Sequence, residues 1–344
     1  MRLLLFPALL SLSSVPSTFS AAIPQALYEI PSAPAPTHRI APEALDVTPP
    51  SAQHEMISAR VDLSGMDSNA DTDPPGKYFH EAHFHHHYDG RFAKNEVSYT
   101  ARRETLIALI RSYLATMNEI GAETWIMHGS LLGWWWNKRI MPWDTDLDVM
   151  VSEDSANHLA KYYNMTVHHY QHAGWSTGRD YMLEMNPYYT NTSREDTLNK
   201  IDGRWVDMES GLFIDITVLH QDVEAQAAGD IGALFCKDNH TYTTDMIFPL
   251  RESVFENITA LIPYAYAEIL ADEYGPAALT NRDFEMHHFD QAVMDWIPIS
   301  SVNDIPTPEP GYEAVPTDLP KPATTLEAAP TPVIPRTGSS IATS

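Results

Sequence analysis

Residues 128–149 read HGSLLGWWWNKRIMPWDTDLDV, and this stretch predicts the centre of the fold. Its end alternates acidic and apolar residues, which is typical of a strand, here over residues 146–151. Asp146 and Asp148 would share one face of that strand, ~7 Å apart at the backbone, and Asp144 lies one step earlier on the same side. Like charges on one face repel each other unless a cation lies between them, and Mg²⁺ or Mn²⁺ prefers carboxylate oxygens. The alternative is a solvated edge strand.

The beginning of the stretch favours a phosphate site. Gly129 and Ser130 stand between a short predicted strand, residues 124–127, and an apolar helical segment. Small residues at a helix N-terminus let backbone N–H groups approach a phosphate. His128 either holds this turn as a core residue or takes a catalytic role.

One more carboxylate stands in an apolar setting. Asp215 interrupts residues 212–219, LFIDITVL, which predict a buried strand. A buried carboxylate is costly unless it is paired or bound to a metal. Asp215 is therefore either a further acidic member of the site or the partner of a buried arginine, with Arg251 as one candidate.

Helices and strands are mixed along the predicted core. Apolar residues at three- and four-residue steps predict a helix that ends at Gly121, and Ser152 is a typical N-cap of another. The predicted helices span 97–120, about 153–163 and about 263–274, and further strands span 180–186 and 204–209. This mixture predicts an α+β fold in one domain, built around one sheet.

The composition restricts the function. The chain has 344 residues, with Lys+Arg 21 against Asp+Glu 46 and a net charge of −25. This balance argues against nucleic acid as a partner and against an anionic membrane surface. The single cysteine, Cys236, excludes an internal disulfide and a cysteine-based zinc site.

The two ends differ from the core. Residues 1–22 predict a signal peptide, with a retained anchor as the alternative, and no stable membrane span is expected once the leader is removed. Residues 23–76 predict a disordered Pro-rich linker, residues 77–300 the folded domain, and residues 301–344 a disordered tail rich in Pro, Thr and Ser. Together with a signal peptide, four glycosylation sequons indicate the secretory pathway, either the Golgi lumen or secretion. They lie at Asn164, Asn191, Asn239 and Asn257.

The layout of strand, Gly-Ser turn, helix, Asp-x-Asp strand and later Asp strand resembles the nucleotidyltransferase superfamily. Within it, residues 128–149 resemble the motif of the LicD family, which includes bacterial phosphocholine transferases and the fukutin-related sugar-phosphate transferases. The chain resembles in particular the fungal mannosylphosphate-transfer proteins of that family. Supporting stretches are KYFHE (77–81), HYDGR (87–91), GLFIDIT (211–217), DNHTY (238–242) and PLRESVFE (249–256).

The resemblance implies a role for each site residue. Three aspartates would hold Mg²⁺ or Mn²⁺, Asp215 would complete the site or act as base, and the Gly-Ser turn would hold a donor phosphate. Lys138 and Arg139 would neutralise a diphosphate, and Trp143 would contact substrate. The implied metal ligands are Asp144, Asp146 and Asp148, the implied catalytic residues are Asp146, Asp148 and Asp215, and the implied phosphate or substrate contacts are His128, Gly129, Ser130, Lys138, Arg139 and Trp143. Trp136 and Thr145 depart from the family pattern, which has Arg and an acidic residue there.

The implied activity is a metal-dependent transfer of a sugar phosphate, such as mannose phosphate from GDP-mannose, onto a glycan hydroxyl. A non-catalytic regulator of a separate transferase is the first alternative. Another donor, such as a phosphocholine or polyol-phosphate nucleotide, is the second. The histidines of residues 80–87 either form a solvated loop or acceptor-site wall, or bind a transition metal. The histidines in question are His80, His83, His85, His86 and His87.

Overall fold

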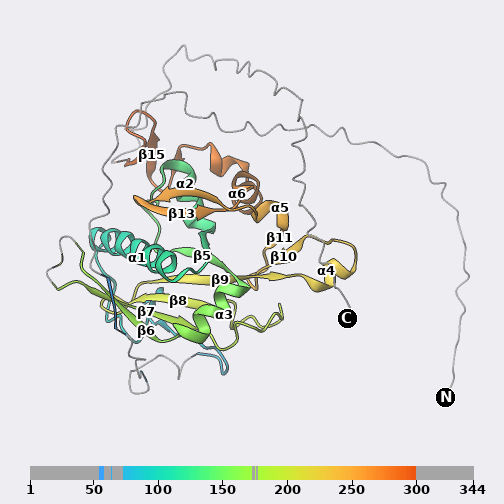
Figure 1. Ribbon diagram of the computed structural model, residues 1–344. Coiled ribbons are helices and arrows are strands. Elements are labelled where there is room, and N and C mark those ends of the chain that lie inside the picture. Colours follow the sequence, from blue (N-terminus) through green and yellow to red (C-terminus); the bar gives the residue numbers. More distant parts are fainter. Residues whose placement is uncertain (1–53, 58–62, 64–72, 173–174, 176, 300–344) are drawn as a thin grey trace, which may run out of the picture. The chain divides into compact units, whose positions relative to one another are not determined.

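The computed structural model describes residues 54–57, 63, 73–172, 175 and 177–299 (Figure 1). The predicted signal peptide, most of the predicted linker and the predicted tail lie outside the described residues. The linker prediction is wrong at one point, because His54–Ile57 forms strand β1, which pairs antiparallel with β6 (Thr166–Tyr170). A four-residue edge strand carries too little periodicity to stand out from a Pro-rich sequence.

The described residues form one mixed sheet of nine strands. Its main path is β1-β6-β7-β8-β9-β10-β11, with β5 pairing to β9 and β4 pairing to β5. The pair β5–β9 is parallel, and the other pairs of this sheet are antiparallel. The remaining strands are β4 (Thr124–Ile126), β5 (Asp148–Ser152), β7 (Arg179–Met185), β8 (Gly203–Asp207), β9 (Phe213–Gln221), β10 (Ala233–Phe235) and β11 (Thr241–Thr243).

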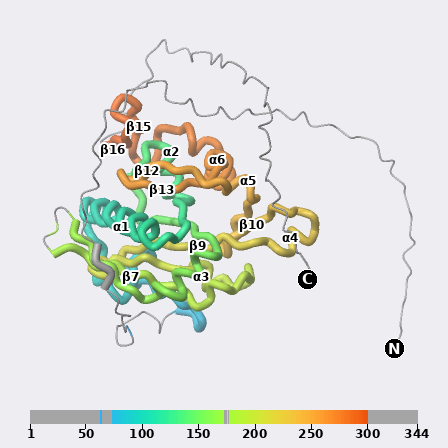
Figure 2. The backbone as a smooth tube through the Cα atoms, viewed as in Figure 1, coloured from blue at the N-terminus to red at the C-terminus, as the bar shows by residue number. Residues whose placement is uncertain are grey.

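Helices and small sheets surround this sheet. In both views, α2, α6 and the β12–β13 hairpin gather on the side of the sheet where α1 lies (Figure 1, Figure 2). The helices are α1 (Tyr99–Ile120), α2 (His128–Asn137), α3 (Glu153–Tyr162), α4 (Val223–Ala227), α5 (Thr244–Ile247), α6 (Tyr266–Tyr274) and the 3-10 helix η2 (Pro276–Leu279). The small sheets are β2–β3 (Glu81–Ala82, His85–Asp89), β12–β13 (Arg251–Phe255, Ile258–Ile262) and β14–β16 (Asp283–Phe284, His287–Asp290, Asp295–Pro298). The predicted α+β class is confirmed.

The predicted helix ends are confirmed where side-chain chemistry specifies them. Helix α1 begins after Ser98, whose Oγ accepts a hydrogen bond from the Ala101 N–H. It ends at Gly121, whose φ of 72° lies in the left-handed region that glycine adopts without strain. Ser152 caps α3 through the Ser155 N–H, as expected.

Several element boundaries differ from the predictions by one to three residues, among them those of β5 and α6. Strand β5 begins at Asp148 rather than at residue 146, so Asp146 lies just before the strand. Helix α6 begins at Tyr266, three residues later than predicted. The backbone N–H groups of Tyr264 and Ala265 donate to carbonyls of α5 instead, which holds them outside the helix.

The two faces of the sheet carry different residues. On one face Trp205 packs against α1, where its Nε1–H donates to Ser112 Oγ (3.0 Å) and its ring centroid lies 6.1 Å from that of Tyr113. Since side chains alternate along a strand, Arg204 and Val206 point to the opposite face. That face carries a second apolar cluster of Phe92, Val167, Met182, Val206 and Phe213. The candidate site lies on the Arg204 face.

Within the described residues, no helix combines the length and the apolar character that crossing a bilayer requires.

Candidate active site

Two carboxylates stand side by side where β5 meets β9. Asp148, the first residue of β5, lies opposite Asp215 of β9 in the parallel register. Across the other edge of β9, Arg204 of β8 lies opposite Asp215. Residues opposed on neighbouring strands point to the same face. Arg204, Asp215 and Asp148 therefore form one row of charged side chains across three strands.

Arg204 is a buried cation at one end of this row. Its Nε donates to Asp215 Oδ1 (2.8 Å) and its Nη2 to Glu81 Oε1 (2.8 Å), and its side chain is 4% exposed. The guanidinium carbon lies 3.7 Å from the ring centroid of Phe213 and 4.6 Å from that of Phe79. Asp215 is thus both the partner of a buried arginine and a neighbour of Asp148, so both sequence interpretations apply.

Arg251, the candidate partner considered from the sequence, does not pair with Asp215. It lies on β12 with its guanidinium carbon 4.1 Å from the ring centroid of Tyr264. The true partner is identified by the β8–β9 register, which sequence spacing does not reveal.

The carboxylates of the site raise one another's pKa values. Burial, followed by the negative charges of Asp146 and Asp215, raises the pKa of Asp148 well above its ordinary value. Burial and the charge of Asp146 raise the pKa of Asp144 well above its ordinary value. Burial also raises the pKa of Asp215, although Arg204 opposes it. Asp146 therefore lies close enough to each of the other three aspartates to repel it, although no three of the four bring one oxygen atom each within 4.8 Å of the others.

Asp146 is more exposed than Asp215. Its side chain is 40% exposed, and its Oδ2 lies 3.4 Å from Nε2 of His87. The Nδ1 atom of the same imidazole shares a 2.6 Å hydrogen bond with Thr145 Oγ1. Burial, together with the neighbouring charges of His86 and His85, lowers the pKa of His87 to about 4, so the ring is neutral at neutral pH. Thr145, which departs from the family pattern, orients this histidine.

The Gly-Ser turn lies at the N-terminus of α2, directly against the first residue of β5. Ser130 Oγ accepts a hydrogen bond from the Asp148 N–H (3.0 Å), and the Met127 N–H donates to the Asp148 carbonyl (3.2 Å). Ser130 therefore fixes the position of Asp148. A Cβ atom added at Gly129 would meet nothing within 4 Å, so the backbone at that residue faces open space. This opening is compatible with the predicted phosphate contact.

His128 is buried at the start of α2, next to the carboxylate row. Its Nδ1–H donates to Glu273 Oε1 of α6 (2.8 Å), and its ring centroid lies 4.6 Å from that of His240. The side chain thus holds α6 against the turn, as the core interpretation expects. Any catalytic role stays a prediction.

Three predicted substrate contacts lie elsewhere. Lys138 follows the C-terminal end of α2 with its Nζ 5.4 Å from the Trp134 ring centroid, and Arg139 pairs with Asp295 (3.0 Å). Trp143 packs in an aromatic cluster, its ring centroid 4.8 Å from that of Trp296. Among the described residues, no recorded contact joins these side chains to the carboxylates. Their substrate roles stay predictions.

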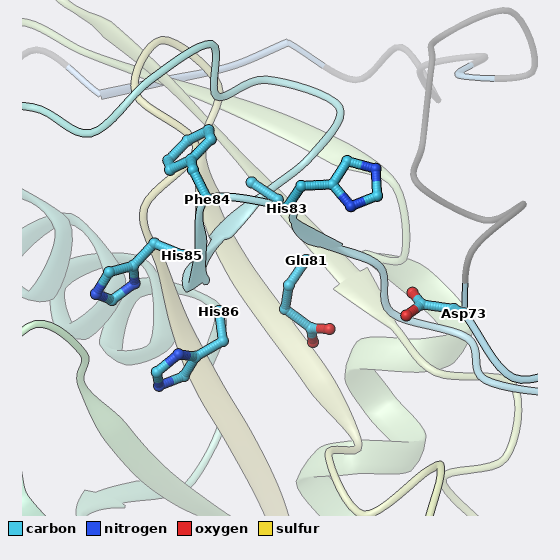
Figure 3. A pocket seen from close by; sticks show the side chains of 7 residues that line it. Asp73, Glu81, His83, Phe84, His85 and His86 are labelled. Atoms are coloured by element: carbon cyan, nitrogen blue, oxygen red, sulfur yellow. The ribbon is translucent and has the colours of Figure 1, made fainter.

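The histidine hairpin β2–β3 lines a cavity of about 360 Å³. In Figure 3 the imidazoles of His85 and His86 and the carboxylate of Glu81 are arranged around this space, with Asp73 at its edge. The lining residues are Asp73, Glu81, Ala82, His83, Phe84, His85 and His86. His87 of the same hairpin contacts Asp146, so the hairpin that lines the cavity also reaches the aspartate site.

A second cavity of about 190 Å³ shares Glu81 with the first and has three basic side chains in its wall. Lys77, Lys200 and Arg204 lie in its wall, with Asp238. The Nη1 atom of Arg204 is buried and has no hydrogen-bond partner among the described residues. This cationic wall adjoins Asp215 through Arg204, and the sequence motif did not contain it.

The four sequons have different surroundings. Asn239 and Asn257 are exposed, with φ of 66° and 62°. The side chain of Asn164 accepts from the Met185 N–H (2.9 Å), and that of Asn191 accepts from the Ser193 N–H (3.2 Å). Glycosylation at all four stays a prediction.

The donor set fits a hard divalent cation. Carboxylate oxygens that repel one another and resist ionisation are stabilised by a cation of that kind. The residues that would hold it are Asp144, Asp146, Asp148 and Asp215, as the sequence suggests. Its identity as Mg²⁺ or Mn²⁺ is a proposal.

The comparisons with known proteins agree with this geometry. Residues 121–265 match the family described as LicD/FKTN/FKRP, nucleotidyltransferase domain. Over these residues the chain is similar to the nucleotidyltransferase domain of the LicD family. The resemblance stated from residues 128–149 is thereby confirmed, and these residues lie inside the matched region.

Two proteins of Saccharomyces cerevisiae are similar to part of this chain. The chain is 29% identical to mannosyltransferase regulator 4 over 136 residues, which is 39% of this chain and 11% of that protein. It is 29% identical to mannosyltransferase regulator 14 over 147 residues, which is 41% of this chain and 15% of that protein. The chain therefore spans less than a sixth of the length of either relative. These matches support a glycan-modifying family.

Proposed function

We propose that this chain is a metal-dependent phosphotransferase. It moves a sugar phosphate, mannose phosphate from a nucleotide-sugar such as GDP-mannose, onto a glycan hydroxyl in the secretory pathway, in the Golgi lumen or outside the cell. The observation that carries the proposal is the row of Arg204, Asp215 and Asp148 beside the N-terminus of α2. It combines carboxylates for a divalent cation with an open backbone at Gly129 for a phosphate.

The reaction exchanges one phosphorus–oxygen bond for another. The oxygen of the glycan hydroxyl forms a bond to the sugar-linked phosphorus of the donor, the bond from that phosphorus to the nucleoside monophosphate breaks, and GMP leaves when GDP-mannose is the donor. The hydroxyl proton passes to a carboxylate. When bound, Mg²⁺ or Mn²⁺ would neutralise the charge on the phosphates.

Asp146 is the proposed proton acceptor. Arg204 donates to Asp215 Oδ1, which makes Asp215 a weaker base than its sequence position suggests. Asp146 is 40% exposed, and partial burial raises its pKa, which makes it a better base than an ordinary aspartate. Asp215 instead positions Arg204 and completes the carboxylate set.

The two cavities supply a place for each substrate. The cationic wall of Lys77, Lys200 and Arg204 suits the phosphates of the donor and replaces the cation expected where Trp136 stands. The histidine-lined cavity offers imidazoles, carboxylates and the Phe84 ring, which suit hydroxyls and the apolar face of a sugar. This assignment makes the hairpin β2–β3 the acceptor wall.

Donor binding tests the proposal. Thermal unfolding of the full chain is measured with GDP-mannose, a phosphocholine nucleotide and a polyol-phosphate nucleotide, each with Mn²⁺ and with EDTA. The proposal expects stabilisation by GDP-mannose that requires Mn²⁺ and is lost in Asp148→Asn. If only one of the other nucleotides stabilises the chain, that nucleotide replaces GDP-mannose as the proposed donor. If no nucleotide stabilises the chain in a metal-dependent way, the result contradicts the proposed enzymatic activity.

A non-catalytic regulator of a separate transferase is the second candidate. It is favoured because both yeast relatives are named mannosyltransferase regulators. Such a regulator would raise the activity of a partner transferase, and Asp148→Asn would leave that effect unchanged. An effect that disappears with Asp148→Asn would count against this candidate.

A further inference from the structure

Three potential metal ligands meet beside the carboxylate row. His128 begins α2, His240 lies on the turn between β10 and β11, and Glu273 lies in the last turn of α6. One ligand atom from each lies within 4.8 Å of the others. His128 lies more than a hundred positions before the other two residues in sequence, so only the fold brings the three together.

Their geometry is close to that of a metal site. His128 Nδ1 lies 2.8 Å and His240 Nε2 lies 4.0 Å from Glu273 Oε1, and the two imidazole centroids are 4.6 Å apart at a tilt of 44°. A tetrahedral ion with bonds of about 2.0–2.2 Å needs ligand atoms roughly 3.3–3.5 Å apart. Two small movements reach that spacing. His240, which is 32% exposed and lies on a turn, moves towards Glu273, and the hydrogen bond between His128 and Glu273 lengthens as the ion replaces its proton.

An independent observation also points to a ligand at this place. Glu273 Oε2 is buried and has no hydrogen-bond partner of normal geometry among the described residues, although the Tyr274 hydroxyl is near enough to Glu273 to lower its pKa. A buried carboxylate oxygen without a partner costs free energy that a bound cation would recover. The other nitrogen of His240, Nδ1, lies 3.8 Å from Cys236 Sγ, which can orient the ring.

We propose that His128, His240 and Glu273 bind a zinc-class transition-metal ion. Two imidazoles and one carboxylate suit Zn²⁺, whereas the oxygen-only set of the aspartates suits Mg²⁺ or Mn²⁺. The three ligands leave a fourth position open on an ion beside Asp148. The ion ties α6 and the β10–β11 turn to the Gly-Ser turn, independently of which reaction the carboxylates support.

Zn²⁺ titration calorimetry on the full chain, stripped of metal and held in millimolar Mg²⁺, tests this site. Mg²⁺ occupies the oxygen-only carboxylates, so the remaining Zn²⁺ binding reports nitrogen-containing sites. The variants are His240→Ala, on an exposed turn, and Glu273→Gln, which keeps a hydrogen bond to His128. The control is His288→Ala, which removes a histidine paired with Asp283 on the β14–β16 sheet.

The proposal predicts one tight Zn²⁺ site per chain. Each of His240→Ala and Glu273→Gln should weaken it by roughly 100-fold, and His288→Ala should leave it unchanged. Co²⁺ in place of Zn²⁺ should give the visible absorption of a four-coordinate site, which both variants lose. Absence of Zn²⁺ binding in the natural chain, or unchanged affinity in both variants, would overturn the proposal. The second result would assign any binding to other histidines, such as those of β2–β3.

Discussion

Asp148 and Asp215 face each other across the parallel strand pair β5–β9. Each has a different second neighbour: the backbone of Asp148 is held by Ser130, whereas the carboxylate of Asp215 is bound by the buried Arg204. The two aspartates therefore contribute differently to the fold, although the sequence motif treats them as one set. This difference can be measured before any substrate is known.

Asp148→Asn and Asp215→Asn should change stability in opposite directions. Without metal, burial and the charges of Asp146 and Asp215 raise the pKa of Asp148, so replacing its carboxylate by an amide should be neutral or stabilising by about 1 kcal/mol. Asp215→Asn leaves the buried Arg204 with Glu81 as its remaining ion-pair partner and should cost up to about 3–5 kcal/mol. Urea unfolding in EDTA measures both. Equal losses in the two variants would show that the carboxylates do not differ in this way.

Ser130→Ala should lower stability as well as activity. It removes the oxygen that accepts the Asp148 N–H and leaves that donor unpaired, at a cost of about 1–3 kcal/mol. A serine that served only a bound phosphate would leave the unfolding of the free chain unchanged. Denaturant unfolding of the ligand-free variant distinguishes the two, and an unchanged midpoint would contradict the structural role.

Gly129→Ala and Gly133→Ala form a matched pair on α2. A Cβ at Gly129 meets open space, so alanine should stabilise the helix by about 0.5–1 kcal/mol while obstructing a donor phosphate. A Cβ at Gly133 would lie 2.4 Å from the Arg139 carbonyl oxygen and should cost about 1–3 kcal/mol. Thermal unfolding and donor affinity are measured for both. Unchanged donor affinity in Gly129→Ala would contradict a phosphate contact at this turn.

Stability should fall in mild acid because of His172. Burial, followed by the charges of Arg179 and Arg111, lowers the pKa of His172 to about 4, and its Nε2 shares a 2.9 Å hydrogen bond with the Tyr181 hydroxyl. The unfolded chain takes up this proton near pH 6.5, so the contribution is complete above that pH and is lost as pH falls towards 4. In urea unfolding across this pH range, the free energy of unfolding should change less steeply with pH in His172→Gln than in the natural chain. Identical slopes would contradict the assignment, since the other groups are common to both proteins.

The sequence predicts the parts of the fold that local chemistry specifies. Gly121 and Ser152 mark helix ends because a left-handed glycine and a capping hydroxyl act within a few residues. Asp146 and Asp148 are recognisable because their spacing is local. Strand β1 and the aromatic sheet β14–β16 are missed, since their stability comes from distant partners such as Trp136, whose ring centroid lies 4.8 Å from that of Phe289.

Some residues of the site are missed by the sequence analysis for the same reason. Arg204 has no local signal and reaches Asp215 only through the antiparallel register of β8 and β9. His87 belongs to a visible histidine cluster, but its contact with Asp146 spans 59 positions in sequence. Lys138 and Arg139 show the converse. They lie within the motif of residues 128–149, but the length of helix α2 separates them from the Gly-Ser turn and so from the aspartates.

Acceptor-dependent release of GMP tests the central claim most directly. The purified chain is incubated with GDP-mannose, Mn²⁺ and a mannose-rich oligosaccharide. The amounts of GMP and of oligosaccharide carrying mannose phosphate are then measured in the same reaction. The account predicts equal amounts of both products, which EDTA abolishes and which Asp148→Asn reduces to background without loss of fold. A folded chain that releases no GMP with either Mg²⁺ or Mn²⁺, or an Asp148→Asn variant with full activity, would contradict it.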